Sequence, residues 1–241
     1  MLHEGLIGLG ILIGYYILAG SLTVLLKKIV KVPSELFRKI LHTICFMSVL
    51  LLLNVFGTWY MAVLAVLTFA LIVYPILALV ERFPLYGRFF AERKSGEVKM
   101  SLILAYLMII VLTAVFWGWM GTSWKYVIVV AVMAWGYGDA AAALVGKAYG
   151  RHYIKHRLVE GKKTVEGTLS MFAVSWLAIF ITTMMYAVEP WYLCLAIALL
   201  VAPVCALVEL FSRRGTDTIT VPFSAAISIF ALVSFFTFLG V

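Results

Sequence analysis

Long apolar runs alternate with short polar segments along the whole chain. A helix needs about 20 mostly apolar residues to cross the hydrocarbon core of a membrane, and eight runs come close to or reach that length. They cover residues 6–26, 40–56, 59–80, 101–119, 124–148, 168–187, 191–210 and 221–240. The pattern predicts an all-α fold, a polytopic helical bundle of about eight transmembrane helices that forms a single integral membrane domain over residues 1–241.

Composition agrees with this interpretation. The chain is 65% hydrophobic and 12% charged, with a mean hydropathy of +1.10. Soluble domains are about 45–50% apolar and about 25% charged, so a large soluble domain is excluded. The three cysteines lie in apolar segments without CxxC spacing, and we expect them to be packing residues and not disulfide partners or metal ligands: Cys45, Cys194 and Cys205.

The basic residues are sorted to one side of the predicted bundle. Of the 19 lysines and arginines, 18 fall in the loops after the first, third, fifth and seventh runs, and Lys125 is the exception. Basic loops remain in the cytoplasm, which predicts that both termini lie on the non-cytoplasmic side. The net charge of +8 is typical of nucleic-acid binders as well. Because the charges occupy short loops between apolar runs, we expect membrane lipids as partners and no nucleic acid.

Asp139 lies inside the fifth run, about nine residues before its cytoplasmic end, at a depth of ~13 Å. An ionisable residue is expensive there, so we expect it to face a polar cavity, a partner or an ion. Small residues surround it, including Gly138 and Gly146. They allow the close approach of a ligand, although helix packing explains such glycines as well. Packing does not explain the aspartate.

A cluster of polar residues opens the sixth run. Lys163, Thr164 and Glu166 supply a cation, a hydroxyl and a carboxylate, and Gly167 follows them. The N–H groups at a helix start attract anions, and Thr164 is the predicted N-cap. No GxxxxGK[ST] element is present, so the cluster is not a P-loop. A basic membrane anchor before a capped helix is the alternative, but together with Asp139 the cluster favours phosphate binding.

Two further groups belong to the predicted cytoplasmic side. Glu209 and Asp217 join Asp139 there, and oxygen ligands suit Mg²⁺; the alternative is that they pair with Arg213 and Arg214. The second group lies at the start of the second run and consists of Arg38, Lys39 and His42. It could be a phosphate clamp with a proton acceptor; the alternative is a basic membrane anchor followed by a buried histidine.

Taken together, these segments resemble the dolichol kinase, phytol kinase and CTP-dependent diacylglycerol kinase family. The resemblance rests on Gly138 to Gly150, Gly161 to Thr168, the RKxxH pattern at Arg38 to His42, and Glu209 with Asp217. It extends over roughly residues 35–226. It implies a membrane enzyme with its active site facing the cytoplasm, which transfers a phosphoryl group from CTP, with a divalent cation, to a lipid alcohol.

The resemblance also implies roles for individual residues. Mg²⁺ on the nucleoside triphosphate is expected at Asp139, Asp217 and Glu209. Glu166 or His42 would orient or deprotonate the lipid hydroxyl, and the sequence does not choose between them. The nucleotide and its phosphates are expected at a larger set: Arg38, Lys39, Lys163, Thr164, Gly138, Gly146 and Gly167.

Two other functions remain open. Phosphatidate cytidylyltransferases share the aspartate-containing helix and the Lys-Thr-x-Glu-Gly element, but their long C-terminal signature is absent here. A transporter of an ion or lipid, with Asp139 as coupling site, would often show an inverted repeat, and none is seen. The lipid alcohol, the nucleotide and the oligomeric state stay undetermined, although the Lys-Thr-x-Glu-Gly-Thr form is similar to the dolichol kinase branch.

Overall fold

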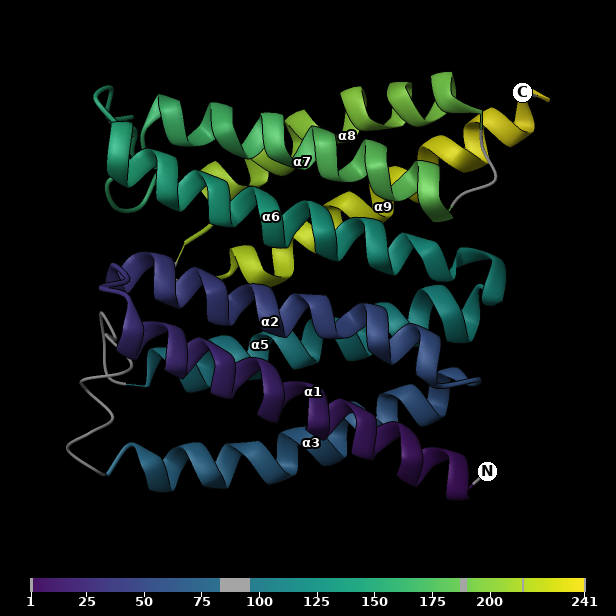
Figure 1. Ribbon diagram of the computed structural model, residues 1–241. Helices are drawn as coiled ribbons and strands as arrows, with labels where there is room; N and C mark the ends of the chain where they lie inside the picture. The colour runs from purple at the N-terminus through teal and green to yellow at the C-terminus, as the bar shows by residue number, and fades with distance from the viewer. Residues whose placement is uncertain (1, 83–95, 187–189, 214, 241) are drawn as a thin grey trace. The chain divides into compact units, whose positions relative to one another are not determined.

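The computed structural model describes residues 2–82, 96–186, 190–213 and 215–240, and every regular element in these ranges is a helix. Eight helices there are long and apolar enough to cross a membrane. The all-α fold with about eight spans is confirmed (Figure 1). The elements are α1 (Leu2–Ile29), α2 (Ser34–Val55), α3 (Trp59–Val80), α5 (Glu97–Leu112), η1 (Thr113–Trp119), η2 (Thr122–Trp124), α6 (Lys125–Tyr149), α7 (Val165–Tyr186), α8 (Trp191–Phe211) and α9 (Asp217–Phe238).

The chain forms two compact units, residues 1–120 and 121–241. The single catalytic domain expected from the sequence remains a prediction. In the first unit, α1 packs on α2 and α3. Helix α3 also packs on α5 and on the π-helix η1, which continues α5. Gly118 of η1 allows this contact, because a Cβ atom there would lie 2.9 Å from the ring of Trp59.

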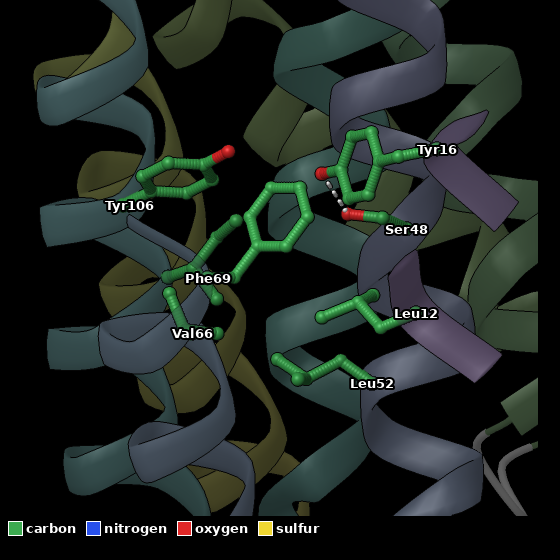
Figure 2. A pocket seen from close by; sticks show the side chains of 8 residues that line it. Leu12, Tyr16, Ser48, Leu52, Val66, Phe69 and Tyr106 are labelled. Carbon is green, nitrogen blue, oxygen red and sulfur yellow. Dashed lines mark hydrogen bonds between the residues drawn. The ribbon is translucent and has the colours of Figure 1, made fainter. Parts of the chain in front are cut away.

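A small cavity lies among α1, α2, α3 and α5, about midway along the helices (Figure 2). Tyr16 donates a hydrogen bond of 2.8 Å to the hydroxyl of Ser48, which itself donates to the carbonyl of Cys45 at 2.6 Å. The ring of Phe69 stacks on Tyr16 at 4.4 Å and meets Tyr106 edge-on at 5.8 Å. Tyr106 is 6% exposed, and its hydroxyl has no hydrogen-bond partner among the described residues.

The second unit is a ring of four helices, in which α7 packs on α6, α8 on α7, and α9 on both α8 and α6 (teal to yellow in Figure 1). The first half of α6 is buried without interruption from Val127 to Gly136. A helix that is apolar all round belongs inside a bundle, and this burial gives the second unit its core. By contrast, much of α1 presents large apolar side chains at the surface, as a lipid-facing helix does.

Five of the described helices begin earlier than the apolar runs predict, and in three of them, α2, α7 and α9, the added turns carry predicted site residues. Helix α7 starts at Val165, directly after the predicted N-cap Thr164, and Glu166 lies in its first turn. Helix α9 starts at Asp217, so this carboxylate lies in a first turn and not in the predicted loop. Helix α2 starts at Ser34, which places Arg38 in its second turn. The hydropathy pattern misses these turns because they are polar. Carboxylates are nevertheless favourable at a helix N-terminus, where the helix dipole is positive.

Candidate functional site

The loop between α6 and α7 is closed by a short stretch of antiparallel pairing. Tyr153 and Thr164 form an isolated β-bridge. The backbone N–H of Ile154 donates to the carbonyl of Lys163 at 3.0 Å, and that of Val165 donates to the carbonyl of His152 at 3.0 Å. These bonds hold the start of α7 beside the residues that follow α6. The two ends of the loop are therefore joined by backbone hydrogen bonds.

Thr164 is the N-cap of α7, as predicted. It is 2% exposed, and its Oγ1 accepts a hydrogen bond from the N–H of Gly167 at 3.2 Å. A Cβ atom on Gly146 would lie 3.1 Å from that Oγ1, and one on Gly167 would lie 3.0 Å from the carbonyl oxygen of Ala142. Close packing of α6 on α7 thus accounts for both glycines. Their predicted contact with a nucleotide stays a prediction.

Asp139 lies in α6 next to the same helix contact. Its neighbour Gly138 is buried, and a Cβ atom there would lie 2.5 Å from the sulfur of Met171 in α7. Asp139 itself is partly buried in the second half of α6, where the helix is less enclosed than at Val127 to Gly136. The helix therefore packs tightly on α7 beside Asp139, while Asp139 itself is only partly buried.

Glu166 has a partner that the sequence does not indicate. The Nδ1 atom of His152 lies 2.7 Å from its Oε1, and the backbone N–H of His152 lies 3.3 Å from both carboxylate oxygens. Fourteen residues separate the two, and His152 sits in a loop without a motif of its own. The loop pairing brings it to the first turn of α7.

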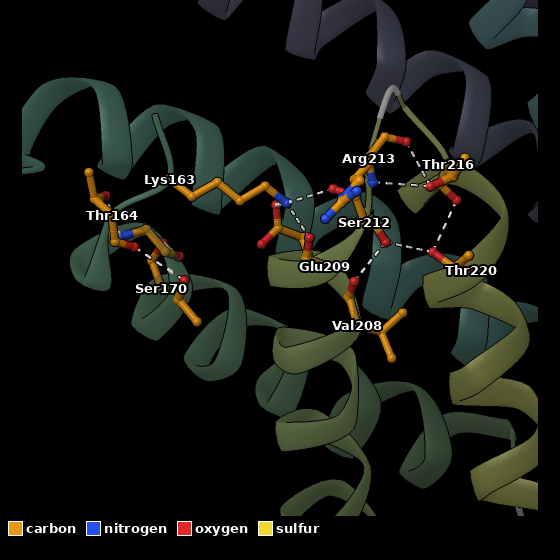
Figure 3. A network of polar contacts seen from close by, with 11 residues as sticks. Lys163, Thr164, Ser170, Val208, Glu209, Ser212, Arg213, Thr216 and Thr220 are labelled. Carbon is orange, nitrogen blue, oxygen red and sulfur yellow. Dashed lines mark hydrogen bonds and ion pairs between the residues drawn. The ribbon is translucent and has the colours of Figure 1, made fainter. Parts of the chain in front are cut away.

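Lys163 and Glu209 form an ion pair, with 3.0 Å between Nζ and Oε1 (Figure 3). The ammonium also donates to the carbonyl of Glu209 and, at 3.4 Å, to that of Ser212. Both side chains are mostly buried. The structure thus joins the predicted phosphate-binding lysine to one of the predicted metal carboxylates, across 46 residues of sequence.

Arg213 connects the turn between α8 and α9 to the loop between α6 and α7. Its guanidinium donates to the carbonyls of Leu158 and Arg157, at 3.2 and 3.0 Å. Its backbone N–H donates to the hydroxyl of Thr216 at 3.2 Å, which orders the turn before α9 (Figure 3). The sequence suggests this arginine as a partner of acidic side chains, whereas these bonds go to main-chain oxygens.

The three predicted metal carboxylates are not assembled into one site. Glu209 lies at the end of α8 and pairs with Lys163, and Asp217 lies in the first turn of α9. In the described ranges, no group of three or more His, Cys, Asp or Glu side chains is spaced to hold a metal ion. The carboxylate chemistry suits Mg²⁺, and magnesium binding by these residues stays a prediction.

The predicted phosphate clamp belongs to the first unit. Arg38 forms an ion pair with Glu35 one turn earlier, and Lys39 is buried. The ring of His42 lies edge-on to Phe46, 6.2 Å between centroids. These three positions therefore lie in the second and third turns of α2, and their role in phosphate binding remains a prediction.

Comparison with known proteins gives one relevant similarity. The chain is 39% identical to a phytol kinase from Synechocystis sp. over 98 residues, which is 41% of this chain and 40% of that protein. The match thus spans about two fifths of the length of that relative. No protein-family model matches the chain, and no solved structure matches it.

Proposed function

We propose that the protein is a membrane-embedded lipid-alcohol kinase, which transfers the γ-phosphoryl group of CTP to the hydroxyl of a polyprenol, dolichol, phytol or diacylglycerol at the cytoplasmic face. The similarity to a phytol kinase supports the class of reaction. The eight apolar helices support a lipid substrate that reaches the site from within the membrane.

One contact carries the proposal, the ion pair between Lys163 and Glu209. In the sequence, these two residues belong to separate segments of one family resemblance. Their contact places both segments at the same end of the second unit, where Thr164 caps α7. Residues that serve one reaction must meet in space, and these two do so although 46 residues separate them.

The chemistry needs little more than positioning and charge neutralisation. The lipid oxygen forms a bond to the γ-phosphorus, the bond from that phosphorus to the bridging oxygen breaks, and CDP leaves. The hydroxyl proton passes to Glu166 or His42. The lysine ammonium and the positive end of the α7 helix dipole would stabilise the charge on the phosphate oxygens. Mg²⁺, if held at Asp139, would neutralise further phosphate charge.

The test uses purified protein reconstituted in lipid with Mg²⁺. Labelled γ-phosphate on CTP or ATP is supplied with polyprenol, dolichol, phytol or diacylglycerol, and the lipid fraction is analysed. We expect label in a lipid alcohol with CTP. Transfer from neither nucleotide to any alcohol would refute the kinase. In that case, α-labelled CTP with phosphatidate tests for CDP-lipid, and solute flux without nucleotide tests for transport.

A further inference from the structure

His152 presents two hydrogen-bond donors to the Glu166 carboxylate. His152 approaches Oε1 with its ring nitrogen Nδ1 at 2.7 Å, and its backbone N–H lies between the two oxygens at 3.3 Å from each. An ionised carboxylate accepts and does not donate, so Nδ1 carries the hydrogen in this contact. These contacts with His152 therefore fix the rotation of the Glu166 carboxylate group.

His152 is itself held in place. Its carbonyl accepts a hydrogen bond of 3.0 Å from the N–H of Val165, the first residue of α7. The adjacent bridge between Tyr153 and Thr164 continues that pairing. The histidine and the glutamate are thus attached to the same helix start, His152 through backbone pairing and Glu166 as part of the helix.

The contacts leave one carboxylate oxygen with more acceptor capacity than the other. Of the donors on His152, Oε1 receives the ring N–H and a share of the backbone N–H, whereas Oε2 receives only the other share. The backbone N–H groups of Arg151 and Glu166 also donate to this carboxylate. Each carboxylate oxygen has about two lone-pair sites. The side chain of Glu166 is 25% exposed, so an approaching hydroxyl has access to it.

We propose that His152 is a positioning residue for the reaction, which holds Glu166 so that Oε2 accepts a hydrogen bond from the hydroxyl of the lipid alcohol. This rests on the proposed kinase function. The sequence leaves open whether Glu166 or His42 orients the lipid hydroxyl, and this proposal assigns that role to Glu166. His152 acts through Glu166 and not on the substrate, and its ring is 78% exposed at the rim of the loop.

The test compares His152→Ala with His152→Asn. Asparagine can place its side-chain N–H close to the position of Nδ1 but cannot carry a proton between groups. We expect His152→Ala to lower kcat by about tenfold to a hundredfold, as small losses of alignment do, with the KM for CTP within about twofold. His152→Asn should recover most of the lost activity.

Three results would overturn the proposal. Wild-type activity in His152→Ala would show that the contact is not needed. Equal loss in His152→Asn and His152→Ala would show that the imidazole itself carries the proton. A double variant His152→Ala/Glu166→Gln that is much slower than Glu166→Gln alone would show that His152 acts independently of Glu166.

A second measurement separates this proposal from the kinase function. In ¹⁵N-histidine-labelled protein, His152 should give an Nδ1–H resonance shifted downfield by the carboxylate, which moves upfield in Glu166→Gln. That shift, found in a protein that phosphorylates no alcohol, would uphold the contact and refute the kinase. An unchanged resonance in an active kinase would refute the contact and leave the kinase in place.

Discussion

Two regions of the molecule hold polar groups that differ in kind. In the cavity of the first unit they are neutral hydroxyls, represented by Tyr16, Ser48 and Tyr106 midway along the helices. At the loop end of the second unit they are charged, as in the pair of Lys163 with Glu209. The bilayer explains the difference, because a hydroxyl is tolerated at depth whereas a charge is favoured where water and headgroups are near.

The two regions also differ in which elements their bonds join. In the neutral region, Ser48 donates to the carbonyl of Cys45 one turn earlier, and Tyr16 donates to Ser48 of the neighbouring helix. The charged groups join distant segments, as Arg213 does with Leu158. Buried hydroxyls thus stabilise single helices or pairs of helices, whereas the charged region determines how loops and helix ends assemble.

The largest expected effect concerns the charge that lies deepest in the second unit. Asp139→Asn should lower phosphoryl transfer by at least about a hundredfold, the usual loss when one charge-stabilising group is removed. The protein should remain folded, because the amide is nearly isosteric with the carboxylate. The rate of label transfer to the lipid is measured, with thermal unfolding as the control for folding. Retained activity in Asp139→Asn, beside a matched exposed variant Glu160→Gln, would contradict the role of this carboxylate.

The next effect concerns the helix contact that supports the charged region. Gly167→Ala should lower the free energy of unfolding by about 1–3 kcal/mol, because its methyl group would meet the carbonyl of Ala142, and the backbone cannot yield easily. The matched control is Gly14→Ala in α1, where a Cβ atom meets nothing within 4 Å. That variant should be neutral or more stable, since alanine is favoured over glycine within helices. Equal thermal midpoints for the two variants would contradict the close packing.

A smaller effect follows from the ion pair. Lys163→Met should destabilise the second unit by about 1–2 kcal/mol, between the values for exposed and buried pairs, because it leaves Glu209 without this partner. The exposed neighbour provides the control, and Lys162→Met should change stability little. Reversal of the pair, Lys163→Glu with Glu209→Lys, should recover part of the loss. Denaturant unfolding in detergent micelles checks all three, and equal values for both methionine variants would argue against the contact.

The smallest effect tests the neutral region. Tyr16→Phe removes a hydrogen bond to Ser48 and should cost about 0.5–1.5 kcal/mol. Tyr106→Phe removes a buried hydroxyl that makes no hydrogen bond among the described residues, and should leave stability unchanged or raise it. Thermal unfolding curves of the two variants, each compared with the wild type, measure these opposite changes in stability. Destabilisation by Tyr106→Phe would indicate that the cavity holds a water molecule bonded to that hydroxyl.

The sequence predicts most of the fold and part of the site. Apolar runs locate all eight spans because the membrane imposes a length and a composition on each. Thr164 is predictable as an N-cap because capping depends on a residue type at a local position. The contacts of His152 and Lys163 are not predictable in this way, since they depend on where a loop and a distant helix end meet in space. The helix start at Asp217 is missed because a polar first turn does not extend an apolar run.

The bonds from Arg213 to the loop have a consequence for how this protein can evolve. Its guanidinium binds the carbonyls of Arg157 and Leu158, which every residue possesses. Substitutions at those two positions should accumulate among homologues without loss of the attachment. Insertions or deletions between residues 155 and 162 would instead displace the carbonyls, so natural variants are expected to keep the length of this loop while its side chains diverge.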